Sequence, residues 1–179
     1  METCLVLLMI IFRDKEILFI TPPKCASTTL HEFFCYQDNN IYTIGPQVDG
    51  AIDKHTSHMP WFAYGIKCYQ RYIIVRNPLT RVESLFNHLQ KHEDIDKDTF
   101  ISSIKEDKIP FAKPISKIYH RSCYDNYIQL ENMETVFKKL NLSIPPVKIN
   151  KSKNKYKFSQ EEIESIMDWA KFDLDAFNY

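Results

Sequence analysis

Short apolar runs separated by polar turns and helix-like stretches predict a mixed α/β protein. Residues 5–12, 17–20, 72–75 and 127–130 are rich in apolar side chains and have the length of buried strands. Arg13, Asp14 and Lys15 form a polar break between the first two runs, which predicts a tight turn and either a hairpin or two neighbouring strands.

The stretches that follow these runs carry apolar residues at helical spacing. A helix is predicted from Ser27 onward, and further helices at 79–90, 98–106, 116–124, 133–140 and from Ser159 onward. Pro78 suits the first position of the second helix, and Ser159 with Glu162 forms a capping box. In the helix at 79–90 an apolar stripe leaves Arg81, Ser84 and His88 on other faces. Strands alternating with helices favour parallel neighbours, so we predict one three-layer α/β domain over residues 1–179, with a central, mainly parallel sheet flanked by helices.

Charge and cysteine content narrow the range of partners. The 179 residues include 23 basic and 23 acidic side chains, so no net field draws the chain to nucleic acid or membrane, and any anion site must be local. The five cysteines lie far apart without a C-x-x-C pair, which indicates reduced thiols rather than a disulfide framework or a zinc cluster. The apolar run at 5–12 is too short to span a bilayer and has no basic flank, so we expect a soluble, cytoplasmic protein.

The segment from Ile17 to Leu30 has the composition of an anion-binding strand–loop–helix. Lys24 supplies a positive charge, and Ser27, Thr28 and Thr29 supply hydroxyl donors at a helix N-terminus, where a phosphate or sulfate ester fits. The glycine pattern of nucleotide triphosphatases is missing, and a cysteine phosphatase would need arginine where His31 stands. An ordinary strand–loop–helix with a surface lysine is the alternative.

A second strand–turn–helix follows at residues 72–90. Arg76 stands at the end of the apolar run and Ser84 lies two turns into the next helix. The forked donors of arginine suit a terminal phosphate, although a salt bridge to a carboxylate is an equal alternative.

Two polar segments carry further candidate residues. His55 and His58 lie in a turn-rich loop, where one histidine as a general base is favoured over a metal pair that lacks a third ligand. A histidine that only bonds a loop carbonyl is an equal alternative. The stretch 147–157 carries five lysines and no acidic residue, and it is either a solvated loop or a flap over an anion.

Together these motifs resemble the sulfotransferases that use 3′-phosphoadenosine 5′-phosphosulfate (PAPS), specifically the carbohydrate branch. Pro23–Thr29 resembles the 5′-phosphosulfate loop of that family, and Val75–Ser84 resembles its 3′-phosphate motif. Lys54-His55 is similar to a lysine–histidine stretch between the two. Leu130-Glu-Asn, Ile149-Asn-Lys-Ser and the ending Asp173–Tyr179 resemble later landmarks in the same order. Glycine is common in the family where Ala26 and Asn178 stand.

The resemblance implies a P-loop-like fold and metal-independent, in-line transfer of a sulfuryl group from PAPS to an acceptor hydroxyl of a carbohydrate, leaving the bisphosphate PAP. It implies His55 as general base and Lys24 as the catalytic cation. The donor-binding residues it implies are Lys24, Cys25, Ala26, Ser27, Thr28, Thr29, Arg76, Ser84, Lys151, Ser152 and Lys153. A non-catalytic module that binds PAP or a related nucleotide is the alternative. A nucleotide kinase would need a P-loop glycine and a magnesium-holding carboxylate, and no persuasive pair is found.

Overall fold

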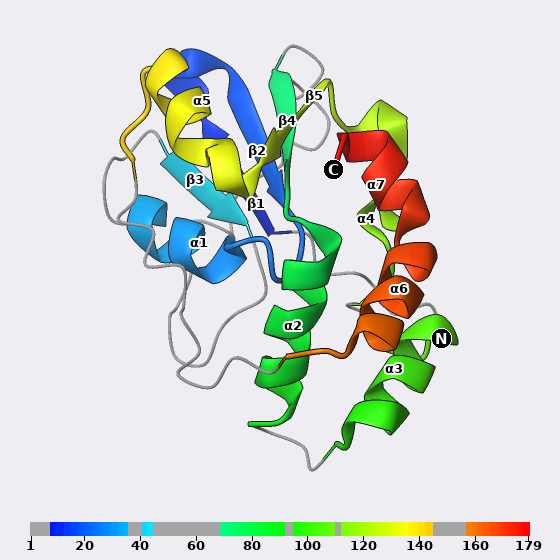
Figure 1. Ribbon diagram of the computed structural model, residues 1–179. Helices are drawn as coiled ribbons and strands as arrows, with labels where there is room; N and C mark the ends of the chain where they lie inside the picture. The colour runs from blue at the N-terminus through cyan, green and yellow to red at the C-terminus, as the bar shows by residue number, and fades with distance from the viewer. Residues whose placement is uncertain (1–7, 36–40, 45–68, 92–94, 110–111, 145–156) are drawn as a thin grey trace.

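A five-stranded sheet forms the centre of the fold (Figure 1). The computed structural model describes residues 8–35, 41–44, 69–91, 95–109, 112–144 and 157–179. The strands are β1 (Leu8–Phe12), β2 (Ile17–Thr21), β3 (Ile41–Ile44), β4 (Gln70–Val75) and β5 (Asn126–Gln129), in the spatial order β3-β1-β2-β4-β5.

The strand directions explain why the binding loops meet. β1 is antiparallel to β2 and to β3, whereas β2 pairs with β4 and β4 with β5 in parallel. Four strands therefore run the same way and β1 alone opposes them, which confirms the predicted mainly parallel sheet. The first two strands form a hairpin through the 3-10 turn η1 (Arg13–Lys15). Because β2 and β4 are parallel neighbours, the loops after them leave the same edge of the sheet.

Helices cover both faces of the sheet, so the predicted three layers are confirmed. Phe19 of β2 stacks on Phe137 of α5 (Met133–Lys139) at 5.2 Å between ring centroids. On the other face Tyr127 of β5 meets Phe177 of α7 (Lys171–Phe177) edge to face at 5.5 Å. Ile20 pairs with Ile73 of β4, and Ile73 pairs with Tyr127, so Tyr127 lies on the same sheet face as Ile20 and on the opposite face from Phe19. Helix α1 (Ser27–Cys35) packs beside α5, where the rings of Phe34 and Phe137 lie 6.1 Å apart between centroids.

Three further helices form a second core beyond the carboxyl edge of the sheet. They are α2 (Pro78–Leu89), α3 (Lys97–Lys105) and α6 (Gln160–Trp169). The single turn α4 (Ile115–Ile118) packs on the main core instead. Buried side chains of α2, α3 and α6 pack together, among them Phe86, Phe100 and Ile166. No helix of the described residues is long and apolar enough to cross a membrane.

Two helix predictions differ from the structure. The expected helix at 116–124 is the single turn α4 followed by the 3-10 turn η5 (Arg121–Cys123), because the side chain of His120 accepts the N–H of Ser122 and begins a new turn. The expected final helix is two helices that meet at Ala170. The capping box of Ser159 and Glu162 is present as predicted.

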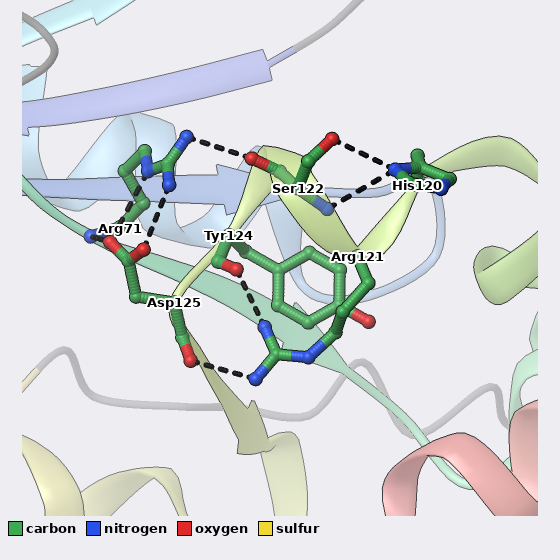
Figure 2. A network of polar contacts seen from close by, with 6 residues as sticks. All are labelled: Arg71, His120, Arg121, Ser122, Tyr124 and Asp125. Atoms are coloured by element: carbon green, nitrogen blue, oxygen red, sulfur yellow. Dashed lines mark hydrogen bonds and ion pairs between the residues drawn. The ribbon is translucent and has the colours of Figure 1, made fainter.

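A polar network closes the amino edge of the sheet, opposite the loops that follow β2 and β4 (Figure 2). Arg71, near the start of β4, makes a bidentate ion pair with Asp125 (Nη2–Oδ1 and Nε–Oδ2, 2.8 and 3.2 Å) and donates to the Ser122 carbonyl. The Arg71 guanidinium lowers the pKa of Asp125 to about 2. Arg121 stacks over Tyr124 and donates to its carbonyl. This network joins β4 to the segment that enters β5.

Candidate functional site

The loop Pro22–Ala26, which we call the anion loop, turns the chain from β2 into α1. Lys24 and Ala26 adopt positive φ angles of 66° and 60°. The N–H of Cys25 donates to the Pro22 carbonyl (3.1 Å), and Leu30 N–H donates to the Ala26 carbonyl (3.0 Å) in the first helical turn. Left-handed residues in a turn direct backbone N–H groups to one side, which is the geometry of anion-binding loops.

The side chains of this segment divide between core and surface. Cys25 is fully buried in the main core, and burial raises the pKa of its thiol to about 12. The thiol is therefore neutral and not available to a ligand. Ser27, Thr28 and Thr29 form the first turn of α1, with Thr28 exposed and the other two half-buried. Their backbone N–H groups belong to the helix N-terminus, where an anion is favoured.

The second predicted unit contacts the first through Arg76. Its Nη1 donates to the Lys24 carbonyl (3.3 Å) and its Nε to Thr80 Oγ1 (3.0 Å). The structure thus brings together Lys24 and Arg76, which are separated by 52 positions in the chain. Ser84 lies further along α2 and is half-buried.

Capping fixes the start of α2 at this point. The side chain of Asn77 accepts N–H groups of Leu79 and Thr80 (3.1 and 3.3 Å), and Pro78 is the first helical residue, as predicted. The Asn77 N–H donates to Glu131 Oε1 (3.1 Å), whose other oxygen accepts the hydroxyl of Tyr179 (3.1 Å). Burial and the Glu131 carboxylate hold the pKa of Tyr179 above its ordinary range, so this hydroxyl keeps its proton. The landmarks around Glu131 and Tyr179 therefore brace the start of α2.

Lys24 lies in an electropositive, half-buried environment. Burial, then the positive charges of Arg76 and Lys91, lower the pKa of Lys24 to about 8. Partly buried cations that repel one another favour the binding of an anion between them, because the anion offsets the repulsion. Lys91 was not predicted, because a lysine just beyond a helix usually only complements the helix dipole.

Arg81 was also missed, and the structure corrects its placement. The side chain is 2% exposed, not on a solvent face of α2. It lies four residues before Leu85, a spacing that could have placed it beside the apolar stripe. Its Nε donates to the Pro23 carbonyl (3.3 Å) and its Nη1 to the carbonyls of Ala112 and Lys113 (3.2 and 3.0 Å).

Several predicted site residues lie outside the described residues: His55, His58, Lys151, Ser152 and Lys153. Their roles stay predictions. In the part of the chain that the structure describes, no three His, Cys, Asp or Glu side chains are grouped to hold a metal ion.

Comparison with known families assigns the fold and these loops to one group of enzymes. A profile described as Sulfotransferase family matches residues 8–140, which include the anion loop, Arg76, Ser84 and the segment through α5. The chain belongs to the sulfotransferase family. Comparison with curated proteins and with solved structures finds no match. Membership supports a transferase of sulfuryl groups, and the mixed α/β fold of this sulfotransferase agrees with it.

Ala26 offers a test of the anion-loop backbone. We expect Ala26→Gly to raise the free energy of unfolding by about 0.5–1 kcal/mol, because glycine adopts a φ of 60° without the steric cost that a Cβ imposes. Urea titration would measure it. Ala170→Gly is the matched control, since Ala170 has a φ of −91° and should lose stability. Equal losses in both variants would show that the left-handed loop is not formed.

Proposed function

We propose that this sulfotransferase transfers a sulfuryl group from PAPS to an acceptor hydroxyl of a carbohydrate. The observation that carries the proposal is the bond from Arg76 to the Lys24 carbonyl, which joins the two predicted phosphate-binding units at the carboxyl ends of neighbouring parallel strands. A ligand with two separated anionic groups suits two such units, and PAPS has a 5′-phosphosulfate and a 3′-phosphate.

The anion loop suits the 5′ end of the donor. Its left-handed residues and the N-terminus of α1 offer N–H donors, and Ser27, Thr28 and Thr29 add hydroxyls. Lys24 supplies the charge there. Burial and then the charge of Arg76 lower the pKa of Lys24, and an anion bound beside it would offset that repulsion.

Arg76 and Ser84 suit the 3′-phosphate. The bonds to Thr80 and to the Lys24 carbonyl orient the guanidinium and occupy two of its five N–H donors. The remaining donors match a terminal phosphate. The capped start of α2 adds the positive end of a helix dipole nearby.

The reaction needs no redox partner. The acceptor oxygen bonds to sulfur as the bond from sulfur to the bridging oxygen breaks, and the electron pair leaves on the 5′-phosphate of PAP. Lys24 would neutralise the charge that develops on that oxygen. The acceptor proton would pass to His55, as the Lys54-His55 resemblance implies. Lys151, Ser152 and Lys153 would cover the donor.

We also expect a cytoplasmic location and no nucleic-acid or membrane partners.

Thermal unfolding with PAP tests the donor site. At a hundred times its dissociation constant, PAP should stabilise the protein by about 2.7 kcal/mol, because it binds only the folded state. ATP, which lacks a 3′-phosphate, should give a much smaller shift. Arg76→Ala should remove most of the PAP shift.

The outcomes separate the possible functions. If PAP and ATP shift the unfolding temperature equally, or neither does, the two units do not form a PAPS site. If PAP stabilises the protein but incubation with PAPS and a panel of glycans releases no PAP, the protein is a binding module for the nucleotide. Release of PAP with one glycan class identifies the acceptor.

A further inference from the structure

We infer that Arg81 is a positioning residue that holds the anion loop in the shape needed for the 5′ end of the donor. The inference rests on the proposed function, because it concerns the same site. The guanidinium acts through backbone carbonyls, and its 2% exposure keeps it from the surface where a ligand would lie.

The contacts of Arg81 join three parts of the chain. From α2 its Nε reaches the Pro23 carbonyl of the anion loop at 3.3 Å, and its Nη1 reaches the carbonyls of Ala112 and Lys113 at 3.2 and 3.0 Å. A buried guanidinium is costly unless such bonds offset the loss of water. The planar fork spans both segments at once, which the point charge of a lysine cannot do.

The anion loop needs a hydrogen bond of this kind to keep its conformation. Lys24, directly after Pro23, and Ala26, two residues further on, are held at positive φ without being glycine. Side-chain-bearing residues persist in this conformation only when the surroundings fix it. The bond to the Pro23 carbonyl comes immediately before the first of them, so its loss would let the loop relax and its N–H groups diverge.

The segment 112–116, which accepts hydrogen bonds from Arg81, is itself held in place by α7. Asp173 of α7 is 2% exposed and accepts the N–H groups of Ile115 and Ser116, each at 2.8 Å, and the Ser116 hydroxyl at 2.7 Å. The segment 112–116 is therefore fixed from α7 by these bonds and offers its carbonyls to Arg81 as a firm support. Thus the anion loop is positioned against α7 through Arg81.

The test compares two ligands that differ only at the 5′ end. The ratio of the affinities of PAP and adenosine 3′-monophosphate reports the contribution of the 5′-phosphate. In the wild type the ratio should be large, and in Arg81→Lys it should fall about tenfold while adenosine 3′-monophosphate binds as before, a loss of about 1.4 kcal/mol confined to one end of the ligand. Titration calorimetry of the full chain would measure both.

Arg71→Lys is the matched control. It breaks the bidentate pair with Asp125 at the opposite edge of the sheet, so it should lower the unfolding temperature and leave the ratio unchanged (Figure 2). A wild type that binds neither ligand would overturn the proposed function. A wild type with the expected ratio, and an Arg81→Lys variant that keeps it or loses both affinities equally, would overturn the role of Arg81 alone.

If Arg81→Lys does not fold, hydrogen exchange of the wild-type protein still tests the inference. PAP should slow amide hydrogen exchange in the anion loop and around Ala112 together, because Arg81 joins them. Protection confined to the anion loop would overturn the inference.

Discussion

Replacing Lys24 with methionine should weaken PAP binding at least thirtyfold and yet stabilise the protein. The loss of binding follows because a charge-assisted bond to a phosphate contributes roughly 2–3 kcal/mol. The gain in stability follows because burial, and then the nearby charges of Arg76 and Lys91, lower the pKa of Lys24 to about 8. Methionine has a similar length and no charge to desolvate, so we expect a gain of order 1 kcal/mol at pH 7. Urea titration and calorimetry would measure the two effects.

The lowered pKa of Lys24 predicts how the free energy of unfolding changes with pH. The pKa of Lys24 falls from 10.5 in the unfolded chain to about 8 in the fold, so between these values the unfolded state binds more protons. The wild type should therefore gain stability as pH rises from about 8 toward 10.5. The advantage of Lys24→Met should be full below pH 8 and shrink across that window. A constant difference across the window would contradict the burial of Lys24.

Lys24→Arg is the matched control for charge. Arginine stays protonated throughout this range, so the variant should retain part of the PAP affinity and gain no stability. In the wild type, PAP affinity should fall above pH 8 as free Lys24 loses its proton, whereas in Lys24→Arg it should not.

The sequence predicted the elements that local rules control. Pro78 predicted the start of α2, and the pair Ser159 and Glu162 predicted the start of α6. The Asn77 cap of α2 was seen only in the structure. The apolar runs predicted β2 and β4, and the α/β alternation predicted the parallel order that brings their loops to one edge. Lys24 and Arg76 could be paired in advance only through the family resemblance, since no local pattern links residues so far apart.

Tertiary contacts account for what the sequence did not predict. Arg81 is buried because the carbonyls of Pro23, Ala112 and Lys113 accept its hydrogen bonds, and a helical wheel of α2 does not include these partners. The ending that begins at Asp173 was noted only as a family landmark with no role for the carboxylate, yet Asp173 caps the start of α4 from α7. The left-handed φ of Ala26 follows from the close turn between β2 and α1, and only the expectation of glycine at that position hinted at it.

The largest effect on turnover is expected from His55→Ala. An alcohol is a poor nucleophile until its proton is removed, and a positioned general base contributes about 10²–10⁴ in rate. The variant should lose that factor in kcat while binding PAP as the wild type does, because the donor contacts proposed above come from the anion loop and α2. His58→Ala, three positions along, is the matched control and should keep near-normal turnover. The reverse pattern would assign the base to His58, and normal turnover in both would exclude this loop as its source.

The pH profile of kcat/KM would separate the two catalytic groups in one experiment. A base that must be neutral gives an acidic limb near the ordinary histidine pKa of about 6.5. A cation that must be charged gives a basic limb, and the pKa of Lys24 places it at about 8. The wild-type profile should therefore be a narrow bell. Lys24→Arg should remove the basic limb only, because the arginine side chain stays charged. His55→Ala should have a much lower kcat/KM and no acidic limb. A basic limb that persists in Lys24→Arg would show that another group, such as the acceptor, controls it, and the proposed part of Lys24 in turnover would be wrong.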